Sequence, residues 1–102
     1  MTHEDLRRQI CDLATLYGWK VQWHWKSYHS PKGWPDLFLA HREKGRAIVA
    51  ELKVKRDKVT PDQQEWLDTL EAVGIPAYVW RDITPIEEIM EILSADNMGT
   101  PE

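Results

Sequence analysis

Three charged side chains interrupt segments that otherwise have the pattern of strands. Asp36 follows a proline and opens the segment 36–41, and Glu51 and Lys53 lie inside the apolar segment 47–54. Residues two apart in a strand point to the same face of a sheet, so Glu51 and Lys53 would lie side by side. Because a buried charged pair is costly without partners or a metal ion, these three residues are candidates for a chemical site.

Two carboxylates from neighbouring strands would form an oxygen-rich pocket of the kind that binds Mg²⁺ or Mn²⁺. The backbone carbonyl of Leu52 would lie in the plane of the sheet and is a further candidate ligand. A metal there would lower the pKa of a bound water and offset the charge of a phosphate under attack. Lys53 beside it would hold a phosphate oxygen or orient the water. The predicted chemistry is therefore hydrolysis of a phosphodiester.

The alternative for Glu51 and Lys53 is an exposed ion pair on a sheet surface, with Asp36 as a turn residue. The tripeptide Glu51-Leu52-Lys53 alone favours that alternative, because such tripeptides are common. A Pro-Asp pair about 15 residues upstream, with a strand on each side, favours the metal site instead.

The segments that must position these residues alternate between helix and strand periodicity. Strands are predicted at 20–26, 36–41, 47–54 and 76–81. Helices are predicted at 4–17, at 60–74 with a Thr60–Gln63 capping box, and from Thr84-Pro85 through Ile86, Ile89, Met90 and Leu93. This α-β-β-β-α-β-α order predicts an α/β fold with a central mixed sheet of about four strands and helices on both faces. We expect one domain over residues 1–96 and a frayed tail at 97–102.

The net charge of −4 argues against a nucleic-acid partner until its distribution is considered. Residues 82–102 contain six acids and no Lys or Arg, so residues 1–81 carry a net charge of +2. Basic residues gather in sequence around the candidate site: Arg42, Lys44, Arg46, Lys53, Lys55, Arg56 and Lys58. Local charge steers a polyanion more than total charge does, so Lys55, Arg56 and Lys58 are candidate DNA contacts. The alternative for residues 42–46 taken alone is a solvated surface.

Cysteine content and hydropathy limit the cellular setting. The one cysteine, Cys11, excludes an internal disulfide and a cysteine-based zinc site within one chain, and it fits a reducing compartment. No apolar run is long enough to cross a bilayer. The chain does not start with a basic stretch followed by an apolar one, as a signal peptide would. We therefore expect a cytoplasmic protein with no membrane partner.

Four motifs follow one another along the chain: Gly33-Trp34-Pro35-Asp36-Leu37, Glu51-Leu52-Lys53, Thr60-Pro61-Asp62-Gln63 and Trp66-Leu67. Together they resemble the VRR-NUC branch of the PD-(D/E)XK nucleases, from Glu4 to about Arg81. The resemblance implies a restriction-endonuclease-like core in which Asp36 and Glu51 bind a divalent metal and Lys53 assists catalysis. It also implies that a Gln on the following helix completes the site, and Gln63 is the matching position.

Several other positions have both a functional and a structural interpretation. Gln63 also suits the capping box, in which case Gln64 is the alternative site residue. The family often carries a first-helix Glu near the metal, which Glu4 matches, and the alternative is a solvated first-turn acid. His29 and Lys32, in the loop before the Pro-Asp motif, are candidate phosphate contacts.

Three tryptophans near the motif, Trp23, Trp25 and Trp34, are candidates for stacking on bases. Because so small a chain needs large side chains in its interior, we expect most of them to be core residues.

By resemblance to small stand-alone members of the family, we expect an endonuclease for branched DNA such as Holliday junctions. It would act as a homodimer in the cytoplasm of a bacterium or of a phage host. The last helix or the tryptophan-rich first strand would supply the apolar dimer patch. The alternatives are a flap, nick or general DNA nuclease of the same fold, a DNA-binding module that does not cut, and an α/β interaction domain without a nucleic-acid role.

Overall fold

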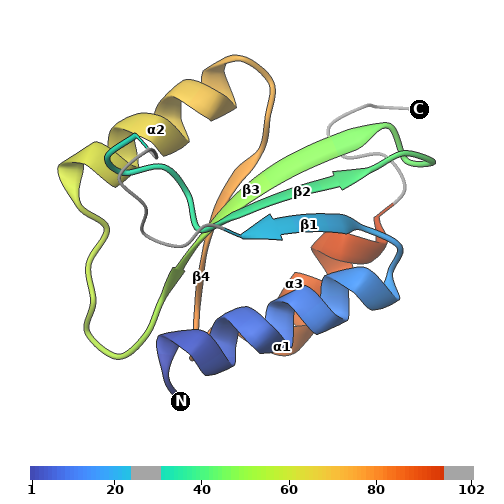
Figure 1. Ribbon diagram of the computed structural model, residues 1–102, viewed down its shortest axis with the longest axis horizontal. Coiled ribbons are helices and arrows are strands. Elements are labelled where there is room, and N and C mark those ends of the chain that lie inside the picture. Colours follow the sequence, from blue (N-terminus) through green and yellow to red (C-terminus); the bar gives the residue numbers. More distant parts are fainter. Residues whose placement is uncertain (24–30, 96–102) are drawn as a thin grey trace.

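The computed structural model describes residues 1–23 and 31–95, which form a four-stranded sheet with helices on both faces (Figure 1). Its elements are α1 (His3–Leu16), β1 (Lys20–Trp23), β2 (Leu37–His41), β3 (Arg46–Lys53), α2 (Pro61–Ala72), β4 (Ala77–Arg81) and α3 (Ile86–Ser94). The predicted α-β-β-β-α-β-α order is confirmed. The predicted end of the first strand, Trp25, His29 and the predicted tail at 97–102 lie outside the described residues.

The strands lie in the order β1-β2-β3-β4. The pairs β1–β2 and β2–β3 are antiparallel, whereas β3 and β4 are parallel because the crossover through α2 returns the chain to the same end of the sheet. Ile48, Val49 and Ala50 of β3 are each 0% exposed. Their apolar character on both faces of the strand had predicted a central position, which is confirmed.

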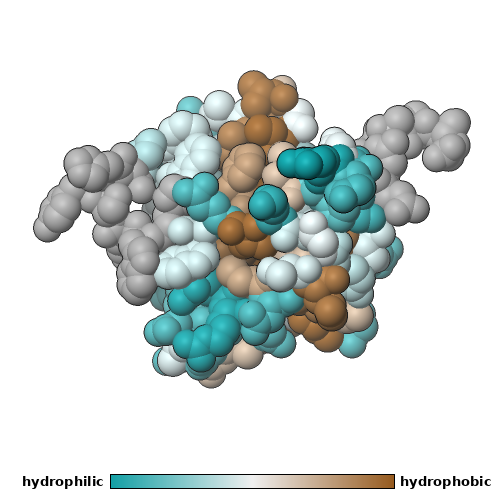
Figure 2. All heavy atoms as spheres, turned by 45° about the vertical axis from the view of Figure 1, so that its right-hand side comes forward, coloured by the Kyte–Doolittle hydropathy of each residue, from teal (hydrophilic) through white to brown (hydrophobic). Residues whose placement is uncertain are grey.

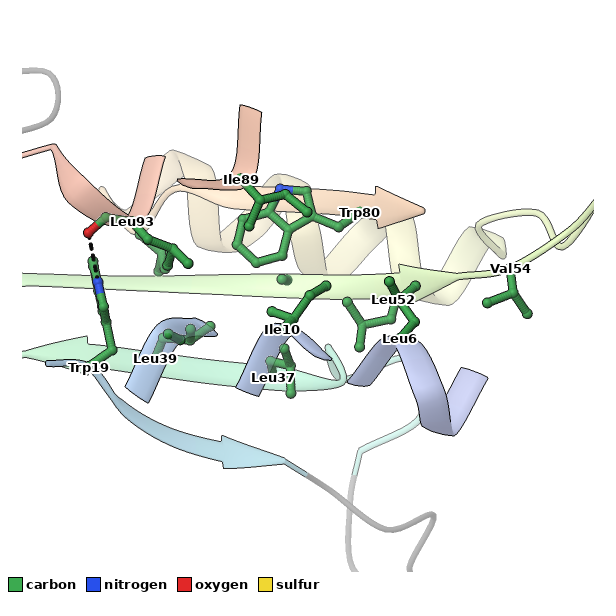
Figure 3. Packing of buried hydrophobic residues seen from close by; sticks show 13 residues of the cluster. Leu6, Ile10, Trp19, Leu37, Leu39, Leu52, Val54, Trp80, Ile89 and Leu93 are labelled. Carbon is green, nitrogen blue, oxygen red and sulfur yellow. Dashed lines mark hydrogen bonds between the residues drawn. The ribbon is translucent and has the colours of Figure 1, made fainter. Parts of the chain in front are cut away.

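The face of the sheet covered by α1 and α3 carries the larger core (Figure 3). Its buried side chains are Leu6, Ile10, Ala14, Trp19, Leu37, Leu39, Ile48, Ala50, Leu52, Val54, Trp80, Ile89 and Leu93. The indole of Trp19 donates a hydrogen bond of 2.9 Å to the carbonyl of Leu93, which ties the chain before β1 to α3. Ile89 and Leu93, expected to contribute to a dimer patch, are therefore core residues of the chain itself.

The opposite face of the sheet is covered by α2. Leu67 and Leu70 of α2 are buried against Val49 of β3. The rings of Trp34 and Trp66 meet edge to face with their centroids 4.8 Å apart. Trp34 therefore helps to pack α2 on the sheet, as the expectation of a core role required.

Apolar side chains on the surface are scattered. The face shown in Figure 2 is largely hydrophilic, and its apolar side chains form small groups rather than one broad patch. Among residues 1–23 and 31–95, the large exposed apolar ones are Met1, Leu16, Val73 and Ile83. Within the described part of the chain, no helix has the length and apolar character needed to span a membrane.

Gly33 allows the loop before β2 to lie directly against the first turn of α2. Its φ is +86°, a conformation that residues with a side chain rarely adopt. A Cβ atom at this position would lie 2.5 Å from the backbone carbonyl carbon of Asp62. Asp36 and Gln63 follow these two backbone segments, so the close approach helps to set their separation.

We predict that Gly33→Ala lowers the free energy of unfolding more than Gly74→Ala does. Gly74 has a similar φ of +93°, but a Cβ there would meet no atom within 4 Å, so its substitution reports backbone strain alone. Such strain costs about 1–3 kcal/mol. The steric clash at Gly33 should add about 1–3 kcal/mol. Urea unfolding of both variants measures the difference, and equal losses would contradict the close contact between the loop and α2.

Candidate active site

The predicted catalytic residues meet at one cavity of about 480 Å³. The end of β3 and the chain before β2 contribute its centre, and α1, β1 and the start of α2 contribute its walls. Its lining residues are His3, Glu4, Arg7, Trp23, Asp36, Glu51, Leu52, Lys53, Asp57 and Gln63. The structure thus gathers residues that are up to 60 positions apart in the sequence.

Glu51 and Lys53 form a buried ion pair at the end of β3. Nζ of Lys53 lies 3.3 Å from Oε2 of Glu51, and the two side chains are only 11% and 3% exposed, respectively. Both project from the α2 face of β3, as does Val49, because alternate residues of a strand share a face. The alternative of an exposed ion pair is therefore wrong. Both charged groups have lost most of their hydration. The attraction between the two charges offsets that desolvation penalty only in part.

Asp36 is held beside this pair by the backbone of β3. The pairing of β2 with β3 ends with Leu37 opposite Ala50. Asp36, which precedes Leu37, therefore lies beside the residues of β3 that follow Ala50. The amide N–H of Leu52 donates a hydrogen bond of 2.9 Å to Oδ2 of Asp36. The N–H and C=O of one strand residue point to the same edge, so the Leu52 carbonyl lies on the edge that Asp36 occupies.

The Glu51 carboxyl is poorly compensated in its ionised form. Its Oε1 is buried and has no hydrogen-bond partner among the residues that the structure describes. Burial, followed by the negative charge of Asp36, raises the pKa of Glu51 to about 7, although Lys53 opposes this shift. The fold therefore keeps an acid at this position that ionises only near neutral pH.

A divalent cation fits this set of donors. It would give Oε1 of Glu51 a partner and reduce the repulsion between Glu51 and Asp36. The residues that the structure describes contain no cluster of three or more His, Cys, Asp or Glu side chains that could hold a metal. Mg²⁺ does not require one, because it usually binds one or two carboxylates and completes its shell with water and substrate phosphate oxygens. The Leu52 carbonyl is the further protein ligand on this edge.

Gln63 both caps α2 and lines the cavity. Its side-chain Oε1 accepts a hydrogen bond from the backbone amide of Thr60 (2.9 Å), and its backbone amide donates to Oγ1 of Thr60 (3.2 Å). The side chain still borders the cavity, so the capping bond does not remove Gln63 from the candidate site. Gln64 instead donates to Oδ1 of Asp68 (2.8 Å), at an exposed position, and does not line the cavity.

The first turn of α1 reaches the site through His3, which the sequence pattern did not predict as a site residue. Nε2 of His3 lies 3.2 Å from Oδ2 of Asp36. Glu4, the predicted first-helix acid, borders the same cavity, but its Oε1 lies 3.2 Å from Nη2 of Arg8 and its side chain is 65% exposed. A capping box at Thr2 begins the helix at His3. That box was the available signal, because it places residues 3 and 4 in the first turn.

The loop after β3 presents the predicted DNA-binding cations at the edge of the cavity. Lys55, Arg56 and Lys58 are exposed, and Asp57 between them lines the cavity. Lys55 has a positive φ of +56°, and its amide donates to Oδ2 of Asp82 at 3.2 Å. This sharp turn is therefore anchored to the chain that follows β4.

The other basic residues are engaged elsewhere. Lys32 pairs at 3.2 Å with a carboxylate in the first turn of α2. Arg42, Lys44 and Arg46 precede or begin β3, so roughly 23 Å of strand separates them from Lys53. Lys44 and Arg46 donate to backbone carbonyls at the C-terminal end of α3, at 3.2 and 3.4 Å. The expectation that these three residues crowd around the site is wrong, because they belong to the opposite end of the strand.

The chain is similar to one domain family and to two solved structures. The VRR-NUC domain family matches residues 3–81. No curated protein sequence is significantly similar to the chain. The solved structure of Archaeoglobus fulgidus Hjc, a Holliday junction resolvase from an archaeal hyperthermophile, has a TM-score of 0.57 and 19% identity, covering 81% of this chain and 75% of that one. A VRR_NUC domain protein has a TM-score of 0.59 and 18% identity, covering 100% of this chain and 97% of the other.

At these identities, the two solved structures establish a shared fold and nothing further. The family match spans over three quarters of the chain and contains every residue that lines the cavity. The chain belongs to the VRR-NUC domain family.

Proposed function

We propose that this protein is a divalent-metal-dependent endonuclease that hydrolyses phosphodiester bonds in DNA. The observation that carries the proposal is the buried Glu51 carboxyl, whose Oε1 lacks a partner among the described residues, in a cavity shared with Asp36 and Lys53. Two carboxylates beside a lysine suit a cation and a phosphate oxygen at the same time. Membership of a nuclease-type domain family supports the same chemistry.

Each residue of the cavity has a definite part in this proposal. Asp36, Glu51 and the Leu52 carbonyl would hold Mg²⁺ or Mn²⁺, which lowers the pKa of a water and stabilises charge on the phosphate. Lys53 donates to a non-bridging phosphate oxygen or to the attacking water. The side-chain nitrogen Nε2 of Gln63, which the capping box does not use, is available to orient that water. Hydrolysis forms one P–O bond to the water oxygen and breaks the one to the leaving oxygen.

We further propose that the substrate is branched DNA such as a Holliday junction, and that the active form is a homodimer. The fold shared with a protein described as a Holliday junction resolvase supports this choice. Resolution of a junction needs two cuts, and a two-fold dimer supplies two copies of the site. Since Ile89 and Leu93 are core residues, a contact through α3 would use its half-buried Ile86 and Met90. A nuclease acting on such DNA belongs in the cytoplasm of a bacterium or of a phage host.

Without metal, we predict that the protein loses stability as the pH rises from about 4.5 to about 7. The pKa of Glu51 is raised from 4.5 to about 7, so the folded protein binds this proton more tightly than the unfolded chain does. That contribution is complete below pH 4.5, is lost as the pH passes the folded pKa, and amounts to at most about 3 kcal/mol. Saturating Mn²⁺ should restore the loss.

Unfolding of wild type and Glu51→Gln, with EDTA or Mn²⁺, measures this contribution. The difference between the two proteins isolates Glu51 from the other acids. A difference that stays constant between about pH 5 and pH 8 would contradict the coupling between Glu51 ionisation and the fold.

Substitutions should separate chemistry from metal binding. Lys53→Met should reduce cleavage at least about 100-fold, because it removes a donor to the reacting phosphate, while Mn²⁺ still raises the melting temperature. Asp36→Ala and Glu51→Gln should abolish both cleavage and the Mn²⁺ effect, since each removes a ligand. Lys20→Met, at the exposed start of β1, is the matched control and should cut normally. Wild-type cleavage by purified Lys53→Met or Glu51→Gln would remove these residues from the site.

Cleavage of a four-way junction and of linear duplex with the same sequence should identify the substrate class. We expect Mn²⁺-dependent, paired cuts at the junction, no cleavage in EDTA, and a sedimentation coefficient of a dimer. Equal cleavage of both DNAs by a monomer would favour a general, flap or nick nuclease. Binding without cleavage at any metal concentration would indicate a DNA-binding module instead.

A further inference from the structure

Arg7 borders the active-site cavity one turn along α1 from His3. Its side chain is only 18% exposed. Its guanidinium carbon lies 3.8 Å from the centre of the Trp23 ring, at the end of β1. Arg7 thus reaches the cavity from the α1 side of the sheet, whereas Lys53 projects from the α2 side of β3.

The charge of Arg7 is only weakly balanced by its neighbours. Oε1 of Glu4 lies 3.9 Å from Nη2 of Arg7, but it lies closer, at 3.2 Å, to Nη2 of Arg8. The Glu4 side chain is 65% exposed, so water screens the attraction that remains. Stacking on an indole uses the face of the guanidinium, and the five N–H donors lie around its edge. The Cys11 thiol contacts part of that edge, and the remaining donors are available to an anion.

We propose that Arg7 binds the phosphate next to the scissile one in the DNA strand being cut, and that Trp23 positions it. The inference rests on the nuclease function proposed above. A planar guanidinium can donate to two oxygens of one phosphate at once. Because Trp23 already fixes the plane of the guanidinium, less conformational freedom is lost when phosphate binds.

This assignment gives the cut strand a contact on each side of the reacting phosphate. Arg7 of α1 stacks on Trp23 of β1, which is the strand at one edge of the sheet. Lys55, Arg56 and Lys58 lie in the loop after β3, which is hydrogen-bonded through the Lys55 amide to Asp82 after β4, the strand at the other edge. The register places Trp23 opposite Leu37, directly after Asp36, so the Arg7 contact adjoins the carboxylates.

A purely structural Arg7 would do no more than cover Trp23 from solvent. Arg7→Met distinguishes the two roles, because methionine keeps an unbranched chain over the ring and removes the charge. Arg8→Met is the matched control, since Arg8 is the neighbouring arginine on α1, is 65% exposed and does not line the cavity. Arg7→Lys keeps the positive charge and removes the planar guanidinium that can donate two parallel hydrogen bonds to one phosphate.

The test measures the affinity of the full chain for a labelled four-way junction and for a duplex across a range of salt concentrations. Ca²⁺ replaces Mn²⁺ so that binding is read on uncut DNA. Arg7→Met should weaken binding to both DNAs about tenfold and reduce the slope of log K against log salt by about 1. Arg8→Met should change affinity less than about twofold. Arg7→Lys should keep the wild-type slope but bind a few-fold more weakly.

The rise in melting temperature on adding Mn²⁺ should be unchanged in all three variants, because Asp36 and Glu51 remain. Equal affinities of Arg7→Met and Arg8→Met, or a wild-type salt slope in Arg7→Met, would overturn the role of Arg7 and leave the nuclease function standing. A wild-type protein that neither binds nor cuts DNA would overturn both. If Arg7→Met does not fold, wild-type affinity in Arg7→Lys would overturn the proposal.

Discussion

The Glu51 carboxyl lies in the central strand, with Oε2 against Lys53 and with Oε1 lacking a partner among the described residues. Its two charged neighbours act in opposite directions, because Asp36 favours the protonated carboxyl and Lys53 the ionised one. Apolar residues of similar volume would often replace a buried ion pair at no cost in stability, so the pair is weak evidence for a structural role. The proposed cation would change the balance between these two effects, because it would favour the ionised forms of both acids at once. The metal-free fold tolerates the arrangement because Glu51 can keep its proton up to about neutral pH.

The remaining features at this end of the sheet hold the surroundings of Glu51 in place. The Leu52 amide fixes Asp36 beside it. Gly33 lets the preceding loop lie on the first turn of α2, and the capping box of that helix directs Gln63 to the cavity. Two helix starts and the ends of several strands converge here, and each contributes at most three polar side chains while its apolar face remains in the core. The local geometry of the site thus depends on ordinary packing elsewhere.

The order of helices and strands and the start of α2 were predictable from the sequence. Strand alternation and the Thr60 capping box depend only on residues that are close together in the chain. The pairing of Asp36 with Glu51 followed from two adjacent strands. The Thr2 capping box indicates only that His3 lies in the first turn of α1. That His3 and Arg7 reach the site depends on how α1 packs across the sheet, which no local pattern predicts. Sequence proximity wrongly placed residues 42–46 near the site, since it does not show at which end of β3 they lie. Periodicity alone did not separate Ile89 and Leu93, which are core residues, from the more exposed Ile86 and Met90 of the same helix.

In the proposed metal site, Glu51 must give up its proton for the cation to bind. Titration calorimetry with Mn²⁺, in buffers of different ionisation enthalpy, counts the protons released on binding. With the pKa of Glu51 near 7, we predict release of close to one proton per metal at about pH 6 and far less at about pH 8. The same release should persist in His3→Asn, which excludes the neighbouring imidazole as the proton source. Binding of Mn²⁺ with no proton release at pH 6, or no binding at either pH, would contradict the account.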